Sequence, residues 1–500
     1  MFKTLVPRAP WRLHRRGVVA LASLVTAVLS CGCSLIPAYE RPVAPVAASY
    51  PAFNAVSTSD AAAATVPWQQ FFTDLRLQQL IALALEHNRD LRVAVLNIEQ
   101  ARSQYQATRA SQLPAVNGVI TGSRTPGLSQ NSINSVYSAG LQVSAYELDF
   151  FGRVASLKEQ ALGQYLATEE GRKTAQISLI AQVATTYLAV LADEELLDIT
   201  RRTLDSREES LKLAKLRFDN GVTSELDYRL VESLLEAARF AYAQQQRQRL
   251  LDDNALTLLV GQPLPPTGAN LLPVPTALRP ALGVEASAVS LVQVQPMADV
   301  PAGLPSDLLA SRPDIRQAEQ LLLAANANIG AARAAFFPKI ALTVQAGSAS
   351  SHLSDLFKTG SWGWTLAPQL LVPIFDAGRN RASLAAAKAQ RDIAVAQYEK
   401  SIQTAFREVA DALASRATLG NQLRASQAQV NAETVRLRLA RLRYDSGAAS
   451  YLDALDAQRS LFSLQQALVQ TRLLQLQNQV TLYKALGGGW TDASLLAATP

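Results

Sequence analysis

The side chains that could carry chemistry in this chain are few. Its two cysteines, Cys31 and Cys33, stand two positions apart. Thiols can form a disulfide or hold a metal ion, but a disulfide at this spacing would be badly strained, and a metal ion would lack further ligands nearby. Neither chemistry is therefore expected at these cysteines.

Catalytic constellations are also missing from the sequence. Beyond residue 32 the only histidines are His87 and His352, both isolated, and no GxSxG, HExxH, P-loop or dinucleotide-binding glycine pattern occurs. The glycine run 487–489 follows an expected helix rather than a strand, so it indicates a helix stop. We predict no enzymatic activity and no catalytic, cofactor-binding or metal-binding residue.

Three residues near the C-terminus, a leucine, an aspartate and an arginine, are spaced to share one helix face. Leu452 and Asp456 are four positions apart, hence on one helix face, and Arg459 lies three positions further along it. Symmetry-related copies of Asp456 around an axis would crowd like charges and raise their proton affinity. The alternative is that Asp456 and Arg459 form a solvated surface pair that contributes little.

The elements that position these residues occur twice. The sequence pattern of residues 88–261 recurs in residues 312–487. Pro114 corresponds to Pro338, 224 positions later, and residues 226–227 correspond to residues 452–453, 226 positions later. A constant offset over such distances indicates two copies of one structural unit, with a two-residue difference absorbed in a loop. Two copies favour a symmetric wall over an active-site cleft.

Each repeat is predicted to run helix, two strands, long helix and shorter helix. The first helices are expected at 75–112 and 311–336, each closed by a proline. Residues 379–444 contain no proline and show coiled-coil spacing, enough for a helix of ~100 Å. The second helix of each pair begins after Gly221 or Gly447, which permit a left-handed turn, so both glycines are expected at hairpin tips where partners are met.

The predicted strands alternate apolar residues with small or polar ones. This pattern holds over 340–346, 362–367 and 141–144 and suits a sheet between lipid and water, although a half-buried sheet in a soluble protein predicts the same alternation. Four strands cannot close a barrel, because an open edge in lipid leaves backbone groups unpaired. Strands that face lipid therefore require oligomerisation, and the residues alone do not choose between two chains and three.

The first 32 residues have the anatomy of a secretory signal, with a basic stretch to Arg16 and an apolar run over 17–30. A transmembrane anchor is the alternative, but the apolar part has about 14 residues against the ~20 that a spanning helix needs. Removing its five basic residues from the 47 of the whole chain leaves 42 against 41 acidic ones. The remainder is near neutral, so a nucleic-acid partner is not expected.

Residues 29–37, Leu-Ser-Cys-Gly-Cys-Ser-Leu-Ile-Pro, resemble the start of OprM/NodT-type efflux lipoproteins in the TolC-like outer membrane factor family. The resemblance covers nearly the whole mature chain, and its most specific stretches are 300–309, 330–338, 453–461 and 482–490. It implies that Cys33, after the small Gly32, is palmitoylated once the signal is cleaved. The inserted Cys31 leaves a second possible acceptor.

The resemblance implies a mixed α and β fold. Three chains would share one outer membrane β-barrel, each giving four strands, and a long periplasmic α-helical coiled-coil barrel would continue it. The predicted parts are a signal peptide (1–32), a lipidated tether (33–67), the first repeat (68–261), a connector (262–310), the second repeat (311–490) and a tail (491–500).

The function implied by the resemblance is a passive exit duct of a tripartite efflux pump for drugs or other small toxic compounds. Its partners would be a periplasmic adaptor, an inner membrane transporter of the RND type and outer membrane lipid, with no cofactor. The family pattern places the channel constriction at Leu452 and Asp456 and its braces at Tyr444 and Arg459. The alternatives are a type I protein secretion channel and a non-conducting periplasmic structural lipoprotein.

Overall fold

The computed structural model describes residues 34–50, 66–126, 133–264, 291, 294, 297–298 and 308–490. The predicted signal peptide, both cysteines, the predicted C-terminal tail and most of the predicted connector lie outside these residues. The chain divides into two compact units, here called the strand unit (1–43, 98–167 and 318–398) and the hairpin unit (44–97, 168–317 and 399–500). Each repeat contributes to both units, so the units cut across the sequence repeats.

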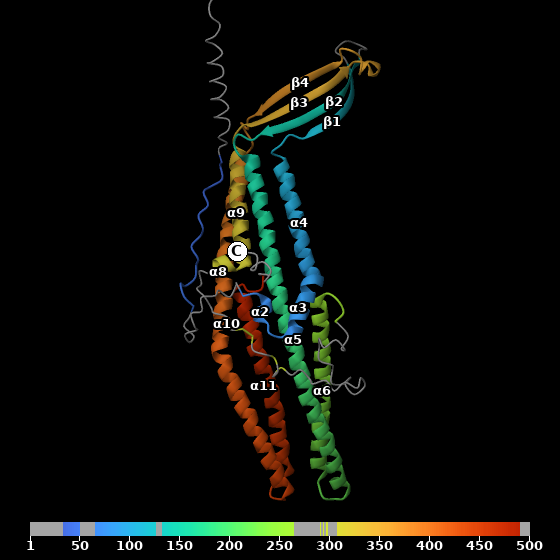
Figure 1. The fold of residues 1–500 in the computed structure, drawn as a ribbon, viewed down its shortest axis with the longest axis vertical. Coiled ribbons are helices and arrows are strands. Elements are labelled where there is room, and N and C mark those ends of the chain that lie inside the picture. The colour runs from blue at the N-terminus through green and yellow to red at the C-terminus, as the bar shows by residue number, and fades with distance from the viewer. Residues whose placement is uncertain are drawn as a thin grey trace, which may run out of the picture. The chain divides into compact units, whose positions relative to one another are not determined.

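The strand unit holds a four-stranded antiparallel sheet in the order β1-β2-β3-β4 (Figure 1). The strands are β1 (Val116–Pro126), β2 (Ile133–Leu148), β3 (Lys339–Ser350) and β4 (Trp362–Leu371). The two repeats meet in the β2–β3 pairing, whose register shifts between Val143 and Tyr146. The shift accommodates a bulge at Ala145, which has a φ of 49°.

The two edge strands of the sheet are exposed on both faces in the single chain. All ten residues of β4 are exposed, and so are all but one of the eleven in β1. A half-buried sheet of a soluble protein would hide one face of each strand. The exposure therefore favours the predicted sheet between two media over that alternative.

The N-terminal segment of the strand unit lies along α9 (Pro313–Ala334). Arg41 pairs with both carboxylate oxygens of Glu319 at 2.8 and 2.7 Å, and the hydroxyl of Tyr39 donates to the same carboxylate at 3.0 Å. Burial and the Glu319 carboxylate raise the pKa of Tyr39 to about 12. Closer to the N-terminus, Arg333 donates to the carbonyl of Leu35 at 3.1 Å. The part of the predicted tether from Leu35 to Arg41 is thus held on α9, the helix that leads into β3.

The hairpin unit contains the turns of two long helical hairpins, whose first helices begin in residues of the strand unit. The helices α5 (Arg153–Asp219) and α10 (Arg379–Asp445) each run for 67 residues, and they turn into α6 (Glu225–Val260) and α11 (Tyr451–Ala485). The prediction of one long proline-free helix from 379 to 444 is correct to within a residue. By length and composition α5 is the one described helix that could cross a bilayer, but 67% of its most apolar window is buried within the protein, as in a core helix.

The first helix predicted for the first repeat, 75–112, is broken into two, whereas the one predicted for the second repeat, 311–336, is a single helix preceded by a short one. The first repeat has α3 (Leu75–His87) and α4 (Arg89–Ala110), and the second has α8 (Leu308–Ser311) and α9, so the breaks fall at Asn88 and Arg312. The Asn88 amide donates to the carbonyl of Leu259 at 2.9 Å, and the Arg312 guanidinium donates to that of Ala485 at 2.9 Å. Each break thus ties its repeat to the end of the shorter hairpin helix, in matching positions.

Aromatic packing fixes the short helix α2 (Trp68–Phe71) against α11 in the hairpin unit. The rings of Phe71 and Tyr483 stack at 4.0 Å, and the Tyr483 hydroxyl donates to the carbonyl of Val66 at 2.6 Å. Arg312 closes the same region by pairing with Asp314 and with Glu408 of α10 at 2.6 and 2.7 Å. These contacts hold the base of the α10–α11 hairpin.

Candidate functional site at the hairpin tips

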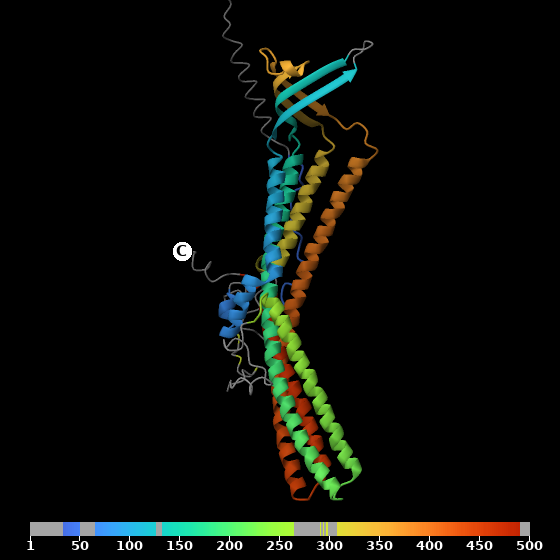
Figure 2. The same ribbon diagram turned by 90° about the vertical axis from the view of Figure 1, so that its right-hand side faces the viewer.

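The two turns of the hairpin unit are built alike, and Figures 1 and 2 show them at the same end of that unit. Gly221 and Gly447 have φ values of 70° and 74°. The residue after each glycine donates its N–H back five positions, Val222 to Arg217 and Ala448 to Arg443, both at 2.8 Å. This is the Schellman closure, which needs a left-handed residue that only glycine supplies without strain.

A serine starts the second helix of each hairpin. Ser224 accepts a hydrogen bond from the N–H of Asp227 at 3.2 Å, and Ser450 accepts one from that of Leu452 at 3.1 Å. Such caps satisfy backbone donors that the helix leaves free. The turn sequences therefore fix where α11 begins and which of its side chains stand in its first two turns.

The first turn of α11 presents Leu452, and the second presents Asp456. Leu452 is 54% exposed. The Asp456 carboxylate pairs with Arg436 of α10 at 2.8 Å and with Arg459 of its own helix at 2.7 Å. The Arg436 hydrogen bond first, and the Arg459 bond after it, lower the pKa of Asp456 below its ordinary value. Within one chain Asp456 is thus a neutralised anion, in contrast to the proton-attracting carboxylate that a bare ring would give.

Tyr444 lies in the last turn of α10 and touches both hairpins. Its ring packs at 4.8 Å from that of Tyr451, and the Arg217 guanidinium of α5 lies 5.1 Å from its centre. A cation over an aromatic face is attracted to the ring's negative face. Tyr444 therefore joins the two turns, whereas Arg459 contacts Asp456 on its own helix.

Two direct hydrogen bonds join the hairpins near their tips. The Tyr451 hydroxyl donates to the Ser210 hydroxyl at 2.8 Å, and the Gln458 amide donates to the Ser206 hydroxyl at 2.8 Å. A cavity of about 220 Å³ lies beside the first of these, lined by residues of both hairpins that include Leu452 and Tyr444. The sequence did not single out Ser206, Ser210, Gln458 or Arg436. Of these, only Arg436 could have been found from the sequence. Arg436 and Asp456 are equally far from Ser446 in the turn, so a helical hairpin with its turn at Ser446 places them opposite each other.

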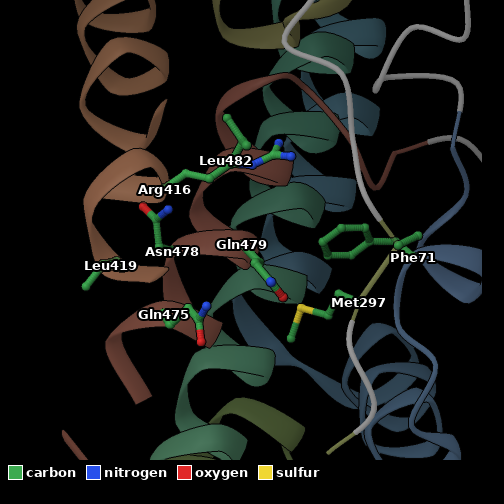
Figure 3. Close-up of a pocket in the computed structure, with 9 residues that line it drawn as sticks. Phe71, Met297, Arg416, Leu419, Gln475, Asn478, Gln479 and Leu482 are labelled. Carbon is green, nitrogen blue, oxygen red and sulfur yellow. The ribbon is translucent and has the colours of Figure 1, made fainter. Parts of the chain in front are cut away.

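A second cavity, of about 200 Å³, lies near the base of the hairpins (Figure 3). The amides of Gln475, Asn478 and Gln479 line it together with Phe71 and Arg416. Amides offer hydrogen bonds but neither a nucleophile nor a proton donor with a tuned pKa. No group of three or more His, Cys, Asp and Glu that could hold a metal ion occurs among the residues that the structure describes.

One buried carboxyl stands apart from the tips. Asp193 of α5 is 6% exposed, accepts a hydrogen bond from Gln245 at 2.9 Å and faces Asp252 of α6. Burial, and then the Asp252 carboxyl, raise the pKa of Asp193. This carboxyl belongs to the packing between α5 and α6 and lies away from the residues of the tips.

The chain matches known proteins over almost its whole length. A family model described as outer membrane efflux protein matches residues 80–262 and 304–488. The chain is 50% identical over 481 residues to a toluene efflux pump outer membrane protein, TtgC, of Pseudomonas putida, in an alignment that covers 94% of this chain and 96% of the relative. The antibiotic efflux pump outer membrane protein ArpC of Pseudomonas putida matches with the same identity and coverage.

The chain is also similar to a solved structure of an outer membrane channel. The open state of the MtrE outer membrane channel of Neisseria gonorrhoeae superposes with a TM-score of 0.80 at 40% identity, over 92% of this chain and 99% of that one. Both the strands and the hairpins are therefore part of the likeness.

Proposed function

The chain belongs to the outer membrane efflux protein family, and on that premise we propose that three copies build one passive exit duct, which receives its cargo from an inner membrane transporter through a periplasmic adaptor. The predicted family, the mixed α and β fold with an internal repeat, the outer membrane location and the role as the outer membrane channel of an efflux pump are confirmed. The subunit count, the partners and the roles of individual residues belong to the proposal.

The open edges of the sheet carry the proposal of a shared barrel. Within the described part of the chain, β1 and β4 lie at the two edges, and each pairs with one neighbour. Edge backbone groups in hydrocarbon would cost several kcal/mol each if left unpaired. Pairing β4 of one chain with β1 of the next removes every edge, and three chains then give a barrel of about twelve strands. Exposed Trp362 and Trp364 suit the interface between that barrel and water.

We expect the purified protein to have a mass near that of three chains and to conduct ions. Sedimentation in detergent, corrected for bound detergent, gives the mass, and planar bilayers give the conductance. A stable folded monomer would contradict the shared barrel. A trimer that never conducts would favour the non-conducting structural lipoprotein instead.

The partners and cargo follow from the tips and from the relatives. The turns at Gly221 and Gly447 are the surface that we assign to the adaptor, and an RND-type transporter would supply the cargo. Relatives at 50% identity are named for toluene and antibiotic efflux, which supports small toxic compounds as cargo over secreted proteins. A duct of this kind needs no enzymatic activity, because the inner membrane transporter supplies the energy.

The tether supports a lipid anchor on the membrane side of the strand unit. Leu35 is held by Arg333, one residue before α9 ends, and β3 begins at Lys339. Cys33, the acyl acceptor that we propose, stands two residues before Leu35 in the sequence.

We therefore predict that Cys33→Ser abolishes labelling with radioactive palmitate while Cys31→Ser retains it. The trimer is expected to form in both variants, because a single acyl chain adds only modest membrane affinity next to a barrel. Labelling that survives in Cys33→Ser and disappears in Cys31→Ser would move the acceptor to Cys31.

A further inference from the structure

The contact between α5 and α11 near the tips, here called the seam, is held by neutral groups. Ser206 and Ser210 lie one helical turn apart on α5, and they meet Gln458 and Tyr451 of α11, which lie two turns apart. Among the described residues no carboxylate bonds across this stretch. Within the part of the chain that the structure describes, the nearest ionic contact between these helices is that of Glu195 with Arg472 at 3.4 Å, three turns further from the tip.

Arg207 is buried in the seam without a counter-ion. It is 3% exposed, and its Nη1 finds no hydrogen-bond partner in the part of the chain that the structure describes. Burial is the main cause that lowers the pKa of Arg207; the nearby Tyr451 hydroxyl acts in the opposite direction, and the positive charges of Arg441 and Arg459 lower the pKa further. The nearby carboxylate of Asp456 is already shared between Arg436 and Arg459.

The other buried arginines of the hairpin unit are compensated. Arg249 pairs with Glu194 and Asp253, and Arg312 pairs with Asp314 and Glu408. The free energy lost when a guanidinium is buried without such partners exceeds the stabilisation from two neutral hydrogen bonds, because water no longer solvates the charge. The seam is therefore the one described contact between the hairpins whose closure works against a buried charge.

The two hairpins are internally better tied than they are to each other. Arg239 of α6 pairs with Glu208 of α5 at 3.4 Å, and Arg436 of α10 pairs with Asp456 of α11 at 2.8 Å. Separation at the seam would break neither pair. It would give Arg207 access to water, while the Glu195–Arg472 contact could stay in place as a pivot.

We propose that Arg207 is an opening residue: its uncompensated burial in the α5–α11 seam biases the two hairpins toward separating at their tips. The inference rests on the proposed duct, whose mouth lies at these tips. The seam hydrogen bonds from Tyr451 and Gln458 oppose the bias, so the mouth stays closed by a narrow margin until a partner shifts it.

The test compares variants of the full-length trimer in planar bilayers. Arg207→Met keeps the length of the side chain and removes its charge, so we expect the open probability to fall about tenfold and the melting temperature of the trimer to rise. Arg207→Lys keeps the charge and is expected to behave like the unmodified protein. Ser206→Ala combined with Ser210→Ala removes the opposing hydrogen bonds and is expected to raise the open probability.

The direction of the Arg207→Met effect decides the question. An arginine that merely stabilises the seam, or that meets a carboxylate of a neighbouring subunit, would on removal lower the melting temperature and leave the open probability unchanged or raised. Either result overturns the inference. Unmodified trimer that does not conduct would instead refute the proposed duct, so the two failures are distinguishable.

Discussion

Replacing Gly140 with valine is expected to abolish the assembled channel. Gly140 of β2 stands opposite Gly347 of β3, at the centre of the sheet where the two repeats meet. A Cβ atom on Gly140 would lie 2.3 Å from the carbonyl oxygen of Ala346 and 2.7 Å from the Cα of Gly347. Both are backbone atoms that cannot move aside, so the strands must part. Overpacking of this kind costs about 3 kcal/mol, and a trimer would incur it three times.

Trimer yield in extracted outer membranes, read from a non-denaturing gel, measures the effect. We expect at least about a tenfold loss for Gly140→Val, since about 1.4 kcal/mol already corresponds to that factor. Ala139→Val is the matched control, because it adds bulk at the next residue, where the sheet already accommodates a Cβ. Valine favours strands, so a loss cannot arise from propensity. A normal yield of Gly140→Val trimer would mean that β2 and β3 do not pair in this register.

Local signals were sufficient to predict the long helices and their turns. The coiled-coil spacing over 379–444 and the glycine at 447 each depend on residues close in sequence, and α10 ends at Asp445, one residue beyond the predicted span. β3 and β4 follow from alternation in the same way. β1 has a weak signal, because Gly118, Gly122 and Pro126 interrupt its pattern.

Contacts between distant segments were not predictable in the same way. The breaks at Asn88 and Arg312 depend on carbonyls 171 and 173 residues away, and helix propensity does not register such partners. At the tips, the resemblance supplied Asp456 and Arg459, but serine and glutamine carry no distinctive pattern, so Ser206 and Gln458 could emerge only from the packing. The charged residues of the tips were readable from sequence, whereas the neutral ones that join the hairpins were not.

The ion selectivity of the mouth is expected to change in opposite directions when the two partners of one ion pair are removed. Asp456→Ala deletes an anion, so Arg459 loses its partner and Arg436 keeps only Glu433 of its own helix. Cation preference should therefore fall, and conductance should rise as the tips loosen. Arg436→Gln deletes a cation and leaves Asp456 less neutralised, so cation preference should increase. A unit charge about 4 Å from an ion in water contributes roughly 1 kcal/mol, which corresponds to about a fivefold change in the permeability ratio.

Reversal potentials across a salt gradient measure this ratio, and they should be recorded at or below about 0.1 M salt, where the screening length is about 10 Å or more. Asp456 has a lowered pKa in the intact pair, so the cation preference of the unmodified channel should persist into mildly acidic solution. Asp411→Ala is the control, because Asp411 is also exposed and lies 3.9 Å from an arginine, Arg407, on α10 far from the turn. If the tips merely loosened, the permeability ratio would change in the same direction in both tip variants. If the charges line the mouth, the ratio changes in opposite directions. If neither variant alters conductance or selectivity, the constriction lies elsewhere, and the roles proposed for Leu452, Asp456, Tyr444 and Arg459 are wrong.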